Sequence, residues 1–148
     1  NLITDSKRER TMIEQTIAHW HQIMESKDAA KLSEILADDV VFLSPVVFTP
    51  QQGKDITQLY LTGAMHTLNG SLKPDGTSFF HYTKKVLAGN QAVLEFETEI
   101  DGKYVNGVDI IECNDEGKII EFRVMLRPLQ AVNLVHQKMG EMLAQLKS

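Results

Sequence analysis

The sequence lacks several features by which protein classes are recognised. Cys113 is its only cysteine, so the chain can form no internal disulfide and no cysteine metal cluster. The longest uncharged, mainly apolar runs, such as residues 40–48, fall far short of the ~20 residues that a bilayer-spanning helix needs. Residues 1–10 contain no apolar core of a signal peptide. We therefore expect no membrane partner and a cytoplasmic location.

Excess positive charge and metal-binding motifs are also missing. The formal net charge is −5 and the pI is about 5.5, which argues against nucleic acid as a partner because phosphate binding requires a basic surface. Neither His-x-x-x-His nor His-Glu-x-x-His occurs, so we expect no metal site, and we expect no cofactor. With 148 residues, 43% of them hydrophobic, and no linker-like tract, residues 1–148 are expected to form a single domain. Within it, residues 1–6 are expected to be disordered.

Helical periodicity dominates the first half of the chain. Ile13, Ile17, Trp20 and Met24 recur at intervals of three or four residues and predict one amphipathic helix. Asp28 is a suitable N-cap for a second, short helix. The predicted segments are helices over residues 6–26, 28–39 and 55–68, with a strand over 40–43 and an irregular loop between Pro45 and Pro50.

The second half alternates with a period of two. Leu94, Phe96, Thr98 and Ile100 are interleaved with glutamates, which is typical of a strand with one buried face. Three turn sequences separate four such segments, and Pro128 ends the last of them. The predicted strands are 79–87, 92–100, 104–113 and 118–127, followed by an appended helix over 129–147. This order predicts an α+β fold, with helices on one side of an antiparallel sheet.

The other face of this sheet is predicted to be polar. It carries Glu95, Glu97 and Glu99 on one strand and Arg123 and Arg127 on another, so opposite charges can pair across the strands. Such a face either meets water or forms an interface between two copies of the chain.

Two sequence blocks resemble the nuclear transport factor 2-like superfamily, and in particular its ketosteroid isomerase and SnoaL-like cyclase branches. The first block contains Leu36-Ala37-Asp38-Asp39-Val40, then Ser44-Pro45, Pro50 and Gly53. The second is Gly107-Val108-Asp109-Ile110-Ile111, followed by 114–120. The resemblance implies a curved sheet wrapped by three N-terminal helices into a cone with an apolar pocket, and a homodimer. Members of the superfamily include isomerases, cyclases, epoxide hydrolases, dehydratases and catalytically silent binding proteins, so the fold alone does not fix the function.

Three functional positions of the isomerases can be carried over by the resemblance. The base falls on Ser44, the tyrosine on Trp20 and the second acid on Asp109. Ser44 cannot abstract a carbon-bound proton unaided, so His66 or His81 is considered as a replacement base. Asp109 shares its strand parity with Gly107 and Ile111, which we assign to the concave face. There, desolvation would raise its pKa and make it a hydrogen-bond donor or an acid.

The predicted site therefore consists of Asp109, Ser44 and His66 as chemical residues and of a mainly apolar lining. The lining residues expected are Trp20, Met24, Tyr60, Met65, Phe96, Val124 and Leu126. Three functions stay open: an isomerase, cyclase or lyase acting on a small hydrophobic carbonyl compound through Asp109, a non-catalytic binding protein for such a molecule, and an interaction module that uses the outer sheet face. The appended helix could close the pocket, join a dimer interface or cover the sheet.

Overall fold

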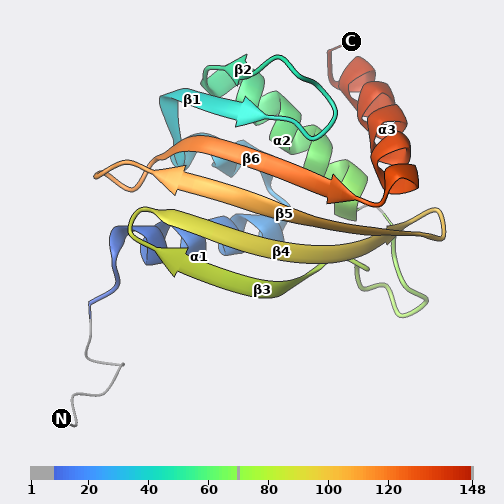
Figure 1. Cartoon of the computed structure of the whole chain (residues 1–148), viewed down its shortest axis with the longest axis horizontal. Helices are drawn as coiled ribbons and strands as arrows, with labels where there is room; N and C mark the ends of the chain where they lie inside the picture. The colour runs from blue at the N-terminus through green and yellow to red at the C-terminus, as the bar shows by residue number, and fades with distance from the viewer. Residues whose placement is uncertain (1–8, 70, 148) are drawn as a thin grey trace, which may run out of the picture.

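The computed structural model describes residues 9–69 and 71–147, so the predicted disorder of residues 1–6 lies outside the described part. In this part, three helices precede the main run of strands and one follows it (Figure 1). The elements are α1 (Met12–Ser26), the 3₁₀ helix η2 (Ala29–Glu34), β1 (Leu36–Leu43), β2 (Gln51–Gln52), α2 (Lys54–Asn69), β3 (His81–Ala88), β4 (Gln91–Ile100), β5 (Lys103–Cys113), β6 (Ile119–Arg127) and α3 (Leu129–Lys147). None of the described helices has the length and apolar character needed to cross a bilayer.

The sheet has six strands in the order β2-β1-β6-β5-β4-β3. The meander from β3 to β6 is antiparallel, as predicted from its turn sequences, but β1 pairs with β6 in parallel. The sheet is therefore mixed, and the prediction of an antiparallel sheet is wrong at this pair. Pairing between β1 and β6 joins segments almost 80 residues apart in sequence, and no local turn signal reports it.

The first two predicted helices have different bounds in the structure. Thr11 caps α1 in a capping box with Glu14, so the helix begins at Met12 rather than at residue 6. Asp28 does cap the next element, but this is the short 3₁₀ helix η2. Pairing of β1 with β6 already begins at Leu36, and the exposed Asp38 and Asp39 lie where the register of that pairing shifts. A strand with such an irregularity can hold two adjacent outward-facing carboxylates, which the sequence pattern assigned to a helix end.

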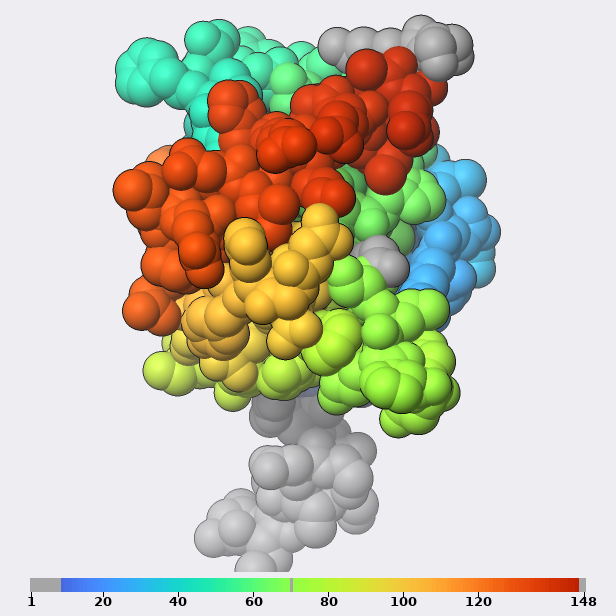
Figure 2. Space-filling view, turned by 90° about the vertical axis from the view of Figure 1, so that its right-hand side faces the viewer, coloured from blue at the N-terminus to red at the C-terminus, as the bar shows by residue number. Residues whose placement is uncertain are grey.

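The helices cover the concave face of the sheet. Helices α1 and α2 lie behind the strands in Figure 1, and the main core fills the space between the two layers. Helix α3 packs on α2 and on the ends of β5 and β6, over a second cluster that includes Val105, Ala131 and Val135. Figure 2 looks at this end and shows α3 lying across it. The appended helix therefore closes the end of the layer of helices rather than covering the sheet's outer face.

Gly107 allows β5 to run beneath the core. It pairs with Phe96 on β4 and with Leu126 on β6. A Cβ atom at this position would lie 2.5 Å from Phe96 Cζ, 2.6 Å from the Met125 carbonyl oxygen and 2.7 Å from Leu126 Cδ2. Because one of these neighbours is backbone, the strand cannot relieve the clash by a side-chain rotation alone.

We therefore expect Gly107→Ala to lower the free energy of unfolding by about 3 kcal/mol, since overpacking of a well-packed core has costs of that order. The matched control is Gly140→Ala on α3, where a Cβ meets no atom within 4 Å. This control should raise stability by up to about 1 kcal/mol, as expected for Ala in place of Gly within a helix. Urea unfolding followed by tryptophan fluorescence measures both, and equal effects of the two substitutions would contradict the packing argument.

Candidate functional site

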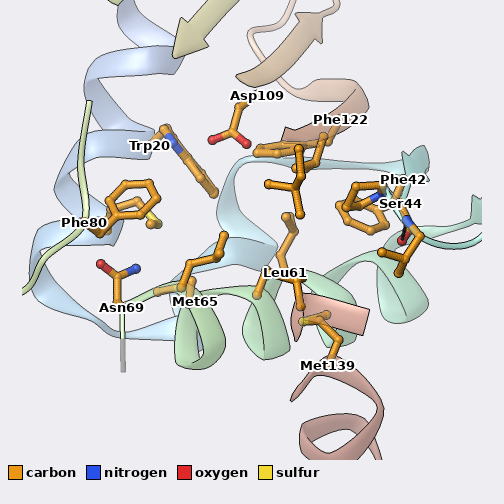
Figure 3. A pocket seen from close by; sticks show the side chains of 18 residues that line it. Trp20, Phe42, Ser44, Leu61, Met65, Asn69, Phe80, Asp109, Phe122 and Met139 are labelled. Atoms are coloured by element: carbon orange, nitrogen blue, oxygen red, sulfur yellow. Dashed lines mark hydrogen bonds between the residues drawn. The ribbon is translucent and has the colours of Figure 1, made fainter. Parts of the chain in front are cut away.

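A small cavity lies between the helices and the concave sheet face (Figure 3). Its volume is about 40 Å³, room for roughly three water molecules at ~10–15 Å³ each. Most of its lining is apolar, and the polar side chains on it are those of Ser44, Asn69 and Asp109, together with the indole of Trp20. The other lining residues are Met24, Phe42, Pro45, Val46, Leu61, Ala64, Met65, Leu68, Phe80, Phe122, Val124, Leu126, Val135 and Met139.

Asp109 lies in the middle of β5 and points toward the helices. Its strand neighbours are Leu94 and Val124, which are both buried, and Asp109 itself is only 5% exposed. Burial raises the pKa of its carboxyl from 3.8 to about 7, and a hydrogen bond from Tyr82 opposes this rise. The predicted inward parity of Asp109 is therefore found in the structure, and the carboxyl group changes charge near neutral pH.

Trp20, Tyr82 and Asp109 form a chain of hydrogen bonds. The Trp20 Nε1–H donates to the Tyr82 hydroxyl oxygen at 3.0 Å, and the Tyr82 hydroxyl donates to Asp109 Oδ2 at 2.7 Å. An indole N–H can only donate, so the single hydroxyl proton of Tyr82 is directed to Asp109. Burial and the neighbouring Asp109 carboxylate raise the pKa of Tyr82, which keeps this proton in place.

This fixed polarity decides which oxygen of Asp109 is available. Oδ2 accepts from Tyr82, and Oδ1 has no protein partner among the residues that the structure describes. When the carboxyl is neutral, its proton therefore resides on Oδ1, which can donate to an acceptor in the cavity. When it is ionised, the same atom accepts a proton or a hydrogen bond.

Ser44 also reaches the cavity, as predicted. Its Oγ accepts a hydrogen bond from the Val46 N–H at 3.1 Å, which folds the start of the β1–β2 loop and leaves the hydroxyl proton free to donate. No histidine lies on the cavity lining within the described residues, so Ser44 has no imidazole beside it to serve as a base.

The two histidines considered as bases lie beside the cavity rather than on its lining, because His66 lines one adjoining surface hollow and His81 another. His66 follows Met65 on α2, and Met65 takes the inward position, so His66 points to solvent because adjacent helical residues face different directions. His81 is exposed and pairs with Glu97 at 3.4 Å. Neither side chain reaches Asp109 or Ser44 across the cavity, and the prediction of His66 as a site residue is not supported by this placement.

Two predicted lining residues stand behind the lining rather than on it. Phe96 is fully buried, and Phe80 stacks on it at 4.9 Å between the ring centroids and so separates it from the cavity. Tyr60 is half-buried and packs against Phe42, with 5.6 Å between the ring centroids, while Leu61 takes the inward position on that turn of α2. The other predicted lining residues are all on the cavity: Trp20, Met24, Met65, Val124 and Leu126.

Tyr82 is the important residue that the sequence did not reveal. Its pairing with Phe96 places it on the inner face of β3, next to Phe80. Two aromatic residues two positions apart were an available signal. However, the register shifts between Tyr82 and Lys84, so the alternation along β3 breaks and the facing of its residues cannot be inferred from parity.

No protein-family model matches the sequence, and no curated protein matches it. Among solved structures, the chain is similar to a steroid delta-isomerase from Pseudomonas aeruginosa, with 27% identity, a TM-score of 0.83, and coverage of 93% of this chain and 95% of that one. It is also similar in fold to a nuclear transport factor 2-like protein of unknown function from Mesorhizobium loti, with 20% identity, a TM-score of 0.66 and coverage of 82% and 96%.

A further similar structure is an epoxide hydrolase/cyclase-like enzyme of pyran ring formation in the polyether salinomycin. The identity is 15%, the TM-score 0.60, and the coverage 78% of this chain and 90% of that one. Identity this low establishes a shared fold and leaves the activity open.

The raised pKa of Asp109 predicts a specific dependence of stability on pH. The native state holds the Asp109 proton up to about pH 7, whereas an ordinary carboxyl, as in the unfolded chain, has a pKa of 3.8. The free energy of unfolding therefore falls as the pH rises between these two pKa values. We expect the free energy of unfolding of the wild type, minus that of Asp109→Asn, to fall by about 4 kcal/mol between about pH 4 and about pH 8. Chemical unfolding at a series of pH values measures this difference.

All other titrating groups are common to the two proteins, so their effects cancel in the difference. One such group is His21, whose ring centroid lies 5.3 Å from that of Tyr82. Burial and Lys85 lower its pKa from 6.5, and it is present in both proteins. A difference that stays constant over this pH range would show that Asp109 is not a desolvated acid.

Proposed function

The chain has the nuclear transport factor 2-like fold, and on this premise we propose that its cavity binds a small hydrophobic carbonyl compound. Asp109 in its neutral form then donates a hydrogen bond from Oδ1 to the carbonyl oxygen. The observation that supports this most strongly is the fixed polarity of the Trp20–Tyr82–Asp109 chain, which leaves Oδ1 available at an otherwise apolar wall.

The composition of the lining supports a neutral ligand. Asp109 is the one ionisable side chain on the cavity lining of the described residues, and its pKa of about 7 means that it is about half neutral at pH 7 and mainly neutral below that pH. A ligand anion would find no cation in the cavity, and burying an unpaired charge there has a large cost. A carbonyl group offers an acceptor without a charge, and its apolar skeleton matches the aromatic and aliphatic walls.

The ligand must enlarge the cavity on entry. The present volume of about 40 Å³ is well below the roughly 300–1,000 Å³ of typical ligand pockets. Three methionines, Met24, Met65 and Met139, line it from three different helices. Methionine side chains are unbranched and flexible and repack readily around a ligand. We therefore propose that these three methionines repack around the ligand as it enters.

Proton transfer on the bound carbonyl compound is the second candidate function, which would make the protein an isomerase, cyclase or lyase. The observation that favours it is the pKa of Asp109, because a group that titrates near pH 7 can both accept and return a proton. Ser44 stands where the resemblance places the isomerase base. A reaction of this kind therefore depends on Asp109 alone, which is a slower arrangement than a separate base and donor.

Binding of 1-tetralone, an apolar bicyclic ketone, tests the binding function. By calorimetry, the affinity should be constant below about pH 6 and fall about tenfold per pH unit well above the Asp109 pKa, because the ionised form has no proton to donate. Asp109→Asn keeps a donor and should bind with no such dependence, and Asp109→Leu should bind about tenfold more weakly. Absence of saturable binding by the wild type at about pH 5 would contradict the proposed function.

The same probe separates a binding protein from an enzyme. In deuterated buffer, a proton-transferring protein exchanges the hydrogens next to the ketone faster than buffer does, and mass spectrometry detects this. Ser44→Asp restores a carboxylate at the base position implied by the resemblance and should accelerate exchange at least tenfold over the wild type. If wild type and Asp109→Asn exchange at the same rate, the wild-type protein does not catalyse proton transfer through Asp109.

We also propose that the chain forms a homodimer through the outer face of the sheet. Strand β5 lies between β4, which carries Glu95 and Glu97 outward, and β6, which carries Arg123 and Arg127. A two-fold axis parallel to the strands sets β4 of each copy over β6 of the other, and thus acidic side chains over basic ones.

Apolar side chains lie at the centre of this outer face. They are the half-buried Val93, Val108 and Ile110 and the 49% exposed Met125. Light scattering at micromolar concentration should give the mass of a dimer, and Met125→Glu should shift it toward the monomer because it adds a like charge at the centre. Leu72→Glu, which changes an exposed residue outside the sheet, is the matched control and should leave the mass unchanged. A wild-type monomer would contradict this proposal.

A further inference from the structure

We propose that Asn69 is a second polar anchor for the ligand, so the ligand carries two oxygen functions, separated by an apolar body. One is the carbonyl that meets Asp109, and the other is a neutral hydroxyl or carbonyl at the mouth of the cavity. This inference rests on the proposed binding function and extends it to the class of ligand.

The hydrogen bonds around Asn69 leave its amide nitrogen free. The Phe80 backbone N–H donates to Ser78 Oγ at 3.0 Å, and the Ser78 hydroxyl donates to Asn69 Oδ1 at 3.3 Å. Asn69 Oδ1 is a carbonyl oxygen and can only accept, so the Ser78 hydroxyl supplies the proton of the second bond. Within residues 9–69 and 71–147, no group accepts from Asn69 Nδ2. The amide therefore has two N–H donors to offer.

Asn69 lies where the cavity meets the surface. It is the last residue of α2 and lines the cavity together with two hollows on the surface, of about 130 and about 270 Å³. Met65 is shared between the cavity and the smaller hollow, and Met24 and Phe80 between the cavity and the larger one. A molecule that enters through either hollow passes Asn69. Figure 3 shows its side chain at the edge of the cavity beside Phe80 and Met65, on the opposite side from Ser44.

The side chains around the entrance determine what the two anchors can hold. In Figure 3, Trp20, Met65 and Phe80 lie along the lining between Asn69 and Asp109 and require an apolar body there. In the larger hollow, Lys27 and Glu25 carry opposite charges, so this entrance has no excess formal charge, whereas the smaller hollow has Lys27 without a carboxylate. A neutral oxygen is the group that the free amide donors of Asn69 recognise.

Four probes of similar size test this inference by calorimetry at about pH 5: tetralin, with no oxygen, 1-tetralone, with one, and the 6- and 7-hydroxy-1-tetralones, with two. The wild type should bind at least one hydroxylated ketone about fivefold more tightly than 1-tetralone, and tetralin more weakly than either. In Asn69→Leu the preference for the hydroxyl should disappear, while the affinity for 1-tetralone stays within about twofold of the wild type.

Asn69→Asp is the second variant, because it keeps the acceptor for Ser78 and removes the amide donors. Tested with 6- and 7-methoxy-1-tetralone, whose ether oxygen can only accept a hydrogen bond, it should lose the preference over 1-tetralone that the wild type shows. If the wild type binds 1-tetralone and shows no preference for a hydroxylated probe, or if both variants retain the preference, Asn69 is not an anchor and the proposed binding function stands. If the wild type does not bind 1-tetralone, the proposed function fails and this inference fails with it.

Discussion

The burial of one carboxyl group governs the chemistry of this protein. Asp109 projects from the middle of β5 into a layer of aromatic and aliphatic side chains, where its charged form is poorly solvated. The chain from Trp20 through Tyr82 fixes one of its oxygens as an acceptor and leaves the other for the cavity. Gly107, two residues earlier on the same strand, lets the β5 backbone approach the core closely enough to bring the carboxyl there. The fold, the pKa and the direction of the available hydrogen bond thus have a common origin in β5.

The side chains that line the cavity explain how a nearly filled core could still admit a ligand. Helix α3 adds Val135 and Met139 to the lining, and Met24 and Met65 contribute from α1 and α2. These flexible side chains occupy space that a ligand can take when they repack. Two hydrogen-bond chains of fixed direction, one ending at Asp109 and one at Asn69, give an otherwise apolar space two oriented polar groups. Under the proposed function, such an arrangement would select ligands by the positions of their oxygens and by apolar shape.

The sequence was informative where local patterns are regular. The hairpins on both sides of β5 are regular, so strand parity placed Asp109 inward, and the spacing of Ile13, Ile17, Trp20 and Met24 placed Trp20 and Met24 at the core. It failed where long-range pairing or an irregularity decides. The register shift in β3 breaks its alternation, so the inward position of Tyr82 could not be predicted. The register shift in β1 places Asp38 and Asp39 on a strand, whereas their sequence pattern predicted a helix end, and the parallel pairing of β1 with β6 has no local signal. His66 lies on a surface hollow beside the cavity rather than on its lining, because Met65, its neighbour, is the inward residue on α2.

The ionisation of Asp109 can be measured directly. Carbon-13 labelling of the aspartate carboxyl groups, with the Asp109 signal assigned from its loss in Asp109→Asn, follows this one group by NMR over a pH series. A midpoint at about 7 is the result that a desolvated carboxyl at this position predicts. A midpoint at or below ~4, the value of a carboxyl in water, would contradict it, and with it the neutral hydrogen-bond donor on which the proposed ligand recognition depends.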